Sequence, residues 1–189
     1  MKIVILGAGA VGSTLANLLS QENDLTIVDN DPVKLHKLEE EADIRTILGG
    51  SSFPNILVNA GIKDADMVVA VTGSDETNLV SCMIAKVLNE SVKTIARVRE
   101  ISYLKGKTKE AMESGQIPVD VHISPEQLIT DHIEGLIEVP GSLQVMEFGQ
   151  GQLNLVAVKA VDGGPMTVSY THLRAHETSL HLVCRLLLE

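Results

Sequence analysis

The stretch that decides the fold is Ile3-Val4-Ile5-Leu6-Gly7-Ala8-Gly9-Ala10-Val11-Gly12, followed after a helical segment by Leu25-Thr26-Ile27-Val28-Asp29. The apolar run predicts a buried strand, and the G-x-G-x-x-G turn after it opens a helix. Gly7 permits a tight turn, Gly9 lets the backbone approach a pyrophosphate, and Gly12 lets the helix pack closely on the strand. The stretch therefore predicts a dinucleotide-binding unit, and the alternative is a glycine turn that packs a helix and binds nothing.

Asp29 indicates which nucleotide would suit this unit. It lies about 20 residues beyond the glycines, where a carboxylate accepts hydrogen bonds from an adenosine ribose. A carboxylate repels a 2′-phosphate, so NAD(H), or another adenine nucleotide with a free 2′-hydroxyl, is favoured over NADP. Asp31 precedes Pro32 and is also a predicted helix N-cap. The predicted contacts in this unit are Gly7, Ala8, Gly9, Ala10, Val11, Gly12, Asp29, Asn30 and Asp31.

The composition excludes several function classes. The chain has 189 residues and a net charge of -10, which argues against a nucleic-acid surface because phosphate binding needs clustered Lys and Arg. Aromatic residues make up 2% of the chain, too few for the base-stacking platforms of a nucleic-acid binder. The sequence has no run of 18 apolar residues, so we expect no direct membrane insertion. The absence of a signal-peptide pattern, and two distant cysteines, Cys82 and Cys184, predict a cytoplasmic chain.

Beyond the opening unit, short apolar strands alternate with helical periodicity. This alternation predicts an α/β fold, a Rossmann-type doubly wound parallel six-stranded sheet, followed by the start of an incomplete second domain. Ligands of such sheets bind at the carboxyl ends of the strands. The predicted strands cover residues 3–6, 25–28, 44–48, 67–71, 94–98 and 119–123, and the predicted helices cover 11–20, 32–41, 54–60, 75–89, 101–114 and 125–137.

The loops at those carboxyl ends supply further candidates. Gly50 and Ser51 follow the third strand, where a glycine-rich backbone can lie against adenine or ribose, unless it is an ordinary turn. Thr72 and Gly73 follow the fourth strand and can line the pocket through backbone groups. Asp75 begins the next helix and complements its dipole, so capping is favoured there over phosphate binding.

Arg97 and Arg99 end the fifth strand, and strand alternation places both guanidinium groups on one face. In so acidic a chain they indicate contacts to phosphates or to carboxylates of another subunit. The alternative is a solvated edge pair.

The last third of the chain changes pattern at Pro140-Gly141. We expect a nucleotide-binding domain over 1–139 and the truncated start of a second domain over 140–166. Residues 167–189 resemble a translated sequencing adapter and are expected to be a foreign tail that makes only accidental contacts. A metal site within that tail is the alternative, on His172, His176, His181 and Cys184.

Four separated motifs carry a resemblance to a known family. They are Met1-Lys-Ile-Val-Ile-Leu-Gly-Ala-Gly9, Asp66-Met-Val-Val-Ala-Val-Thr-Gly-Ser-Asp-Glu-Thr-Asn78, Ile95-Ala-Arg-Val-Arg99 and Ser124-Pro-Glu-Gln-Leu128. With these, residues 1–165 resemble the RCK/KTN family of regulatory subunits. The resemblance implies homo-oligomers of RCK domains, peripheral on the inner face of the plasma membrane, that gate a Trk-type membrane potassium translocator on binding NAD(H), ATP or ADP.

The resemblance also bears on the site and on the extent of the chain. Some relatives have Arg at the position of Ala10, where it reaches a nucleotide phosphate, and its absence shifts that task to Arg97 and Arg99. Some family members carry tandem domain pairs, and the resemblance to them implies that this chain is about the first third of a longer protein.

The sequence thus leads to a main functional hypothesis and an alternative. The first is a non-catalytic nucleotide sensor, without catalytic or metal-binding residues, that regulates potassium uptake. The alternative is an NAD-dependent oxidoreductase truncated before its substrate domain. Tyr103 and Lys107 have the spacing of a proton-transfer pair in short-chain dehydrogenases, but the glycine pattern and the position of the pair differ from that family.

Overall fold

The computed structural model describes residues 1–148, 153–159 and 182–188. The chain divides into two compact units, Met1–Pro125 and Glu126–Glu189. The predicted nucleotide-binding domain extended to residue 139, whereas the first compact unit ends at the start of the last helix. We describe each unit by itself.

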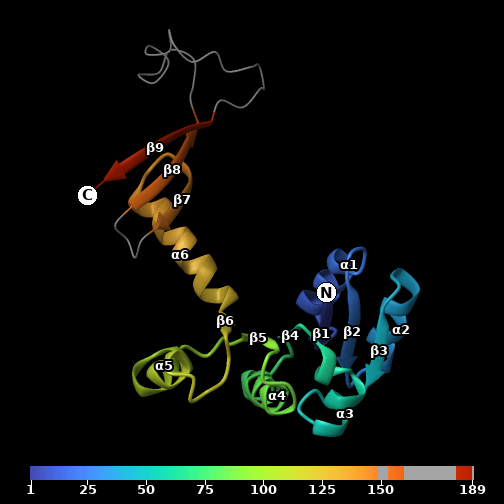
Figure 1. Cartoon of the computed structure of the whole chain (residues 1–189). Helices are drawn as coiled ribbons and strands as arrows, with labels where there is room; N and C mark the ends of the chain where they lie inside the picture. The colour runs from blue at the N-terminus through green and yellow to red at the C-terminus, as the bar shows by residue number, and fades with distance from the viewer. Residues whose placement is uncertain (149–152, 160–181, 189) are drawn as a thin grey trace. The chain divides into compact units, whose positions relative to one another are not determined.

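The first unit is built on a parallel six-stranded sheet in the order β3-β2-β1-β4-β5-β6 (Figure 1). Every pairing within it is parallel, which confirms the predicted doubly wound Rossmann sheet. The strand order reverses between β1 and β4, so a ligand crevice is expected there, at the carboxyl ends. The strands are β1 Lys2–Leu6, β2 Asp24–Asp29, β3 Arg45–Leu48, β4 Met67–Ala70, β5 Lys93–Arg97 and β6 Val121–Ile123.

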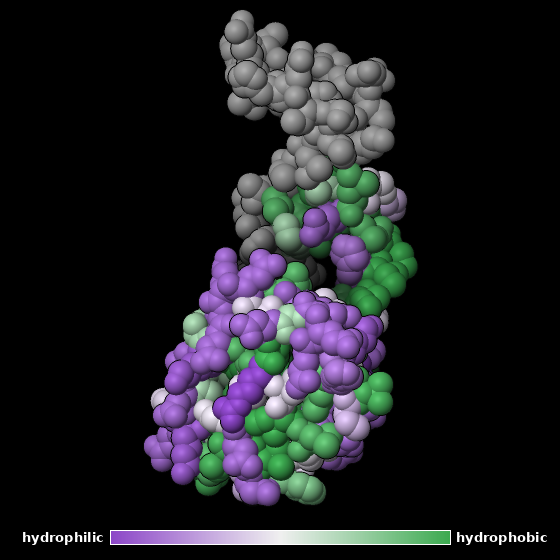
Figure 2. Space-filling view, turned by 90° about the vertical axis from the view of Figure 1, so that its right-hand side faces the viewer, coloured by the Kyte–Doolittle hydropathy of each residue, from purple (hydrophilic) through white to green (hydrophobic). Residues whose placement is uncertain are grey.

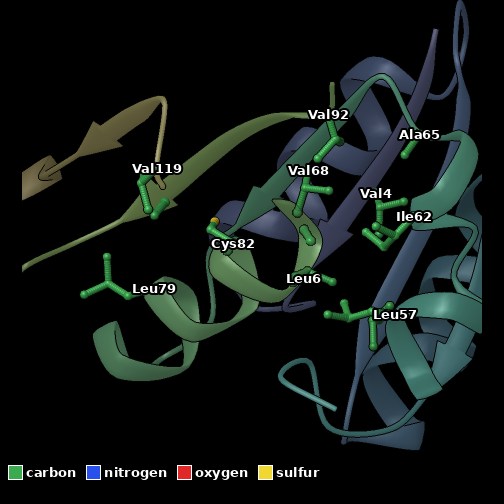
Figure 3. Close-up of a cluster of buried hydrophobic side chains, with 14 of the residues drawn as sticks. Val4, Leu6, Leu57, Ile62, Ala65, Val68, Leu79, Cys82, Val92 and Val119 are labelled. Atoms are coloured by element: carbon green, nitrogen blue, oxygen red, sulfur yellow. The ribbon is translucent and has the colours of Figure 1, made fainter. Parts of the chain in front are cut away.

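Helices cover both faces of this sheet because the buried strands are apolar on both sides. Ile3 and Ile5 of β1 lie in one buried cluster, with side chains of α1 and α2, and Val4 and Leu6 lie in the other. Figure 3 shows this second cluster, where Leu6 lies near Leu57 and Val4 lies near Ile62. The helices are α1 Ala10–Leu19, α2 Pro32–Glu41, α3 Pro54–Asn59 and α4 Asp75–Leu88, with the 3-10 turn η1 Ile62–Asp64.

Two predicted elements differ from the observed ones. The helix expected over 101–114 is divided into η2 Ile101–Leu104 and α5 Gly106–Glu113. Lys105 between them is extended and Gly106 has φ +57°, so regular helical bonding stops there. The strand expected over 119–123 begins only at Val121, because the side chains of Asp120 and Thr94 replace the backbone ladder.

The second unit contains the helix α6 Pro125–Glu138, which begins at the last residue of the first unit, and an antiparallel sheet β7-β8-β9. Its strands are β7 Ser142–Phe148, β8 Leu153–Lys159 and β9 Leu182–Leu188. β7 and β8 pair antiparallel. Strand β9 lies in the segment expected to be foreign and pairs with β8 along its length, so for these residues the contacts are regular. His172, His176 and His181 lie outside the described residues. Within the described part of the chain, no helix is both long and apolar enough to span a membrane.

Candidate functional site

The glycine turn between β1 and α1 has the geometry that its sequence predicts. Gly7 has φ +107°, which favours glycine, and its N–H donates to the Val28 carbonyl at 2.8 Å. A Cβ atom at Gly7 would lie 3.0 Å from the backbone N and Cα of Thr72. The turn thus brings the end of β1 close to β2 on one side and to the loop after β4 on the other.

The other two glycines of the turn differ in their surroundings. A Cβ atom at Gly12 would lie 1.8 Å from the carbonyl oxygen of Gly7, so this position is closed to any side chain. A Cβ atom at Gly9 would meet nothing within 4 Å, and Gly9 is exposed. Gly12 is therefore needed for the turn itself, whereas the protein leaves the space over Gly9 open.

Helix α1 begins at this open space, and no side chain caps it. Gly9 is its N-cap and makes no side-chain hydrogen bond to the helix, and no acidic residue lies in the first turn. The first N–H groups of a helix have no partner within it, and the helix dipole adds positive potential at the same end. The N-terminus of α1 is therefore arranged to accept an anion such as a phosphate.

Asp29 is buried at the end of β2 and holds the glycine turn. Its Oδ2 atom accepts a hydrogen bond from the Ala8 N–H at 2.6 Å, and Oδ1 accepts from the Asp31 N–H at 2.8 Å. The residue is 8% exposed. A carboxylate offers about four acceptor positions, so a ribose hydroxyl can still bind, but Asp29 also has a structural task that the sequence did not reveal.

Of the two residues that follow Asp29, one is exposed and the other caps a helix. Asn30 is exposed. Asp31 caps α2, because its Oδ1 atom accepts from the Val33 N–H at 3.0 Å, and this backbone hydrogen bond lowers the pKa of the Asp31 carboxyl. Its Oδ2 atom lies 3.5 Å from Lys34 Nζ. The predicted capping role of Asp31 is confirmed.

The loop after β3 lies beside the tip of β2. The Gly49 N–H donates to the Asp29 carbonyl at 2.9 Å. Ser51 is buried, and its carbonyl accepts from the Ser81 hydroxyl of α4 at 3.0 Å. Gly50 and Ser51 are therefore held next to the end of β2.

The loop after β4 is fixed by Asn78, a fully buried residue of α4. Its Oδ1 atom accepts from the N–H and the hydroxyl of Thr72, at 2.9 and 2.7 Å. Its Nδ2 atom donates to the carbonyls of Arg97, at 2.9 Å, and of Thr72, at 3.3 Å. The Thr72 amide is thus used inside the protein. The sequence did not single out Asn78, although it is a polar residue next to Leu79, Cys82 and Ala85 on the buried face of α4.

Arg99 is bound to the start of α4. Its Nε atom lies 3.5 Å from Oδ1 of Asp75, and its guanidinium also donates to the Gly73 carbonyl. Asp75 in turn accepts from the backbone N–H groups of Arg99 and Glu100, both at 2.8 Å. Arg97 is half-buried at the end of β5. Arg99 is thus an exposed residue that Asp75 and the Gly73 carbonyl hold at the loop after β4.

The metal-site alternative concerns tail histidines that lie outside the described residues. Within the residues that the structure describes, no group of three or more His, Cys, Asp or Glu residues could hold a metal ion. Burial, with the nearby charge of Asp120, raises the pKa of the Cys82 thiol to about 12 and outweighs the opposite effect of Lys86. This suits a core residue and not a nucleophile. Tyr103 lies in η2 and packs against the core, whereas Lys107 lies in α5.

Comparison with known proteins identifies the family of this chain. The model of the TrkA-N domain matches residues 3–125. The Trk system potassium uptake protein TrkA of Halomonas elongata is 53% identical over 167 residues, which are 88% of this chain and 36% of that protein. The chain thus spans about a third of the length of this relative.

Two solved structures share the fold. The GsuK channel bound to NAD superposes with a TM-score of 0.63 and 19% identity, over 82% of this chain and 27% of that chain. The Kef C-terminal domain of Shewanella denitrificans in an AMP-bound form superposes with a TM-score of 0.56 and 21% identity, over 74% of this chain and 82% of that chain. These two likenesses show the fold, and the family match over the whole sheet shows that the chain belongs to the TrkA-N domain family.

Proposed function

We propose that the first unit binds NAD(H) or an adenine nucleotide such as ADP or ATP, and acts as a nucleotide sensor rather than an enzyme. The observation that carries the proposal is the uncapped start of α1 at Gly9, with open space over that glycine and a buried carboxylate at the neighbouring strand end. This is the arrangement that holds a pyrophosphate and a ribose in Rossmann folds.

The nucleotide would lie across the carboxyl ends of β1, β2 and β4. Its pyrophosphate would contact the backbone of residues 7–12, and its ribose would bind Asp29. The site of this proposal consists of Gly7, Ala8, Gly9, Ala10, Val11, Gly12, Asp29, Asn30, Asp31, Gly50, Ser51, Thr72, Gly73, Arg97 and Arg99. The two similar structures with NAD and AMP support the choice of ligand class.

Regulation of potassium uptake follows as the second part of the proposal. The relatives are named as Trk system potassium uptake proteins, and their names are not those of enzymes. We expect the intact protein to form a homo-oligomer through its RCK domains on the cytoplasmic face of the membrane. Its partner there would be a Trk-type potassium translocator, gated by nucleotide binding. A ligand shifts such a gate only by its different affinities for the two states.

We expect Arg99 to make nucleotide affinity depend on the charge of the phosphates. Its guanidinium lies between Asp75 and the Gly73 carbonyl, so a phosphate arriving at this loop would compete with Asp75 for it. Replacement by Gln should narrow the affinity difference between ATP and ADP, while leaving adenosine affinity unchanged. An affinity difference between ATP and ADP that stays at the wild-type value in both the Arg99→Gln and Arg97→Gln variants would remove both residues from the site.

The test of the proposed function is a nucleotide titration by calorimetry and thermal unfolding. NADH, ADP or ATP should raise the melting temperature with the logarithm of ligand concentration once that concentration exceeds Kd, because a ligand of the native state stabilises it by mass action. Hydride transfer to candidate alcohols or keto acids, measured alongside, would favour the truncated oxidoreductase. No binding of any of the three nucleotides would refute the proposal.

A further inference from the structure

We infer that Phe53 is the platform on which the adenine base of the nucleotide stacks. This inference rests on the proposed function and adds a base-binding residue to it. Phe53 is the last residue before α3 and follows the loop after β3. Its side chain is a large apolar group left 59% exposed.

The ring lies on the loop that borders the proposed ribose site. A Cβ atom at Gly50 would come within 2.9 to 3.3 Å of the ring atoms Cε2, Cδ2 and Cζ of Phe53. Gly50 thus makes room for the ring, which rests against the loop backbone. Figure 2 views the side of the molecule where α2 and β3 lie in Figure 1, and hydrophobic surface is visible there among hydrophilic side chains.

The backbone around Phe53 is held at several points, so the ring is placed in advance. The Phe53 N–H donates to the Gly50 carbonyl at 3.0 Å, and its carbonyl accepts from the Leu57 N–H at 3.0 Å. The hydrogen bond from Ser81 to the carbonyl of buried Ser51 fixes the middle of the loop. Pro54 follows directly and restricts the backbone further. A ring on so constrained a turn loses little entropy when a base covers it.

The position of Asp29 directs the base toward this ring. The glycosidic bond joins the base directly to the ribose, so a ribose held at the end of β2 places the base at the end of the next strand. On one side that strand is β1, whose end is occupied by the glycine turn. On the other side it is β3, where Leu48 pairs with Asp29 and Gly49 donates to the Asp29 carbonyl. Phe53 belongs to the loop that leaves this strand.

A phenyl ring suits this task because a stacked base needs a flat apolar face. Stacking of one base on one aromatic side chain is worth about 1–3 kcal/mol, and it requires no further aromatic residue. The low aromatic content argued against an extended nucleic-acid platform, and one exposed phenylalanine at the ribose site fits a single nucleotide instead.

A single tryptophan tests the inference directly, because the chain contains none. In the Phe53→Trp variant, stacking of adenine should quench the indole emission saturably as ADP is added. The matched control is Val87→Trp, on an 83% exposed residue near the C-terminal end of α4. Its emission should not respond to ADP, because helix α4 runs back along the sheet and ends at the opposite edge.

Affinity measurements on the 189-residue chain complete the test. Phe53→Ala should weaken ADP and NADH binding about 5- to 150-fold, the equivalent of one stacked base. Phe53→Tyr, which keeps the ring, should stay within about twofold. Wild-type ADP binding with neither quenching in Phe53→Trp nor weakening in Phe53→Ala would overturn the inference and leave the proposed function standing. If Phe53→Ala changed only the oligomeric state, Phe53 would be a protein contact. If the wild type bound no adenine nucleotide, both proposals would fail together.

Discussion

Two helices of the first unit start at the same edge of the sheet and start differently. Helix α1 follows β1 and has a glycine N-cap, no side-chain cap and no acidic residue in its first turn. Helix α4 follows the adjacent strand β4 and has a Ser74 cap, with Asp75 and Glu76 in its first turn. The protein supplies the hydrogen-bond partners and negative charge at α4, and leaves the corresponding place at α1 open.

This difference locates the anion site on one of two neighbouring helix starts. At α4 the Ser74 hydroxyl accepts from the Thr77 N–H at 3.1 Å, and Glu76 accepts from the same hydroxyl at 2.8 Å. A phosphate there would face carboxylates, and the Thr77 N–H already has a partner. At α1 it would find unpaired donors and the helix dipole. The same fold element is therefore open to an anion at α1 and closed by its own cap and carboxylates at α4.

The largest expected effect on stability comes from placing a side chain at Gly12, the last glycine of the G-x-G-x-x-G turn. In Gly12→Ala the new methyl group would be placed 1.8 Å from the Gly7 carbonyl oxygen, so α1 must move away from β1. We expect a loss of about 3 kcal/mol in the free energy of unfolding. Urea denaturation measures this loss, and a variant as stable as the wild type would show that the turn tolerates a side chain.

Removal of the buried amide beneath α4 should have a smaller but still large effect. Asn78→Ala leaves the Thr72 amide and the Arg97 carbonyl without this partner, which should cost about 2–3 kcal/mol. Asn17→Ala is the matched control, because the Asn17 side chain bonds only to Glu41 at an exposed position and should matter by less than about 0.5 kcal/mol. Equal denaturation midpoints for the two variants would contradict the role of Asn78.

The two helix starts can be separated by removing the cap that α4 has. Ser74→Ala should lower the free energy of unfolding by about 1 kcal/mol. Its NADH and ADP affinities should stay at the wild-type values, because the Ser74 hydroxyl bonds within the start of α4 and the proposed pyrophosphate site is the start of α1. A drop in nucleotide affinity as large as the drop in stability would show that α4 also belongs to the ligand site.

The smallest expected effect is a pH dependence at the other end of α4. Partial desolvation raises the pKa of Asp120, but hydrogen bonds from Lys86 and Thr94 outweigh it and hold that pKa below its ordinary value. The ion pair between Lys86 and Asp120 measures 2.9 Å. Because the pKa is lowered in the folded state, its contribution is complete above about pH 4 and is lost as the pH falls through the folded-state value.

The measurement compares wild type with Asp120→Asn by denaturation between pH 3 and pH 7. The variant should be less stable at pH 7 by at most about 1 kcal/mol, and the difference should shrink toward pH 3. A difference that stays constant with pH would show that the ion pair contributes nothing that depends on protonation.

The sequence predicted the parts of this account that depend on local patterns. The apolar run of β1, the glycine turn and the capping of α2 by Asp31 each follow from residues close together in the chain. The parallel, doubly wound sheet followed from the alternation of strands and helices. The division of the helix over 101–114 could not be predicted, because the extended Lys105 and the left-handed Gly106 are one outcome among several for that segment.

The parts that the sequence missed depend on contacts between distant residues. Arg99 and Asp75 are 24 residues apart, so their ion pair is visible only once β4 and β5 lie side by side. For the same reason the sequence showed Asp29 as a ligand residue and not as the holder of the Ala8 amide. A polar residue within an apolar stripe, as Asn78 is in α4, was the available signal of such a contact.

The central claim is that the space over Gly9 is a phosphate site, and Gly9→Ala tests it most directly. No atom lies within 4 Å of the new methyl group, and the φ of Gly9 is -74°, so the melting temperature should stay close to that of the wild type. The methyl group would occupy the place of the pyrophosphate, so the affinities for NADH and ADP, measured by calorimetry, should fall about tenfold or more. A stable Gly9→Ala protein that bound both nucleotides as tightly as the wild type would contradict the claim.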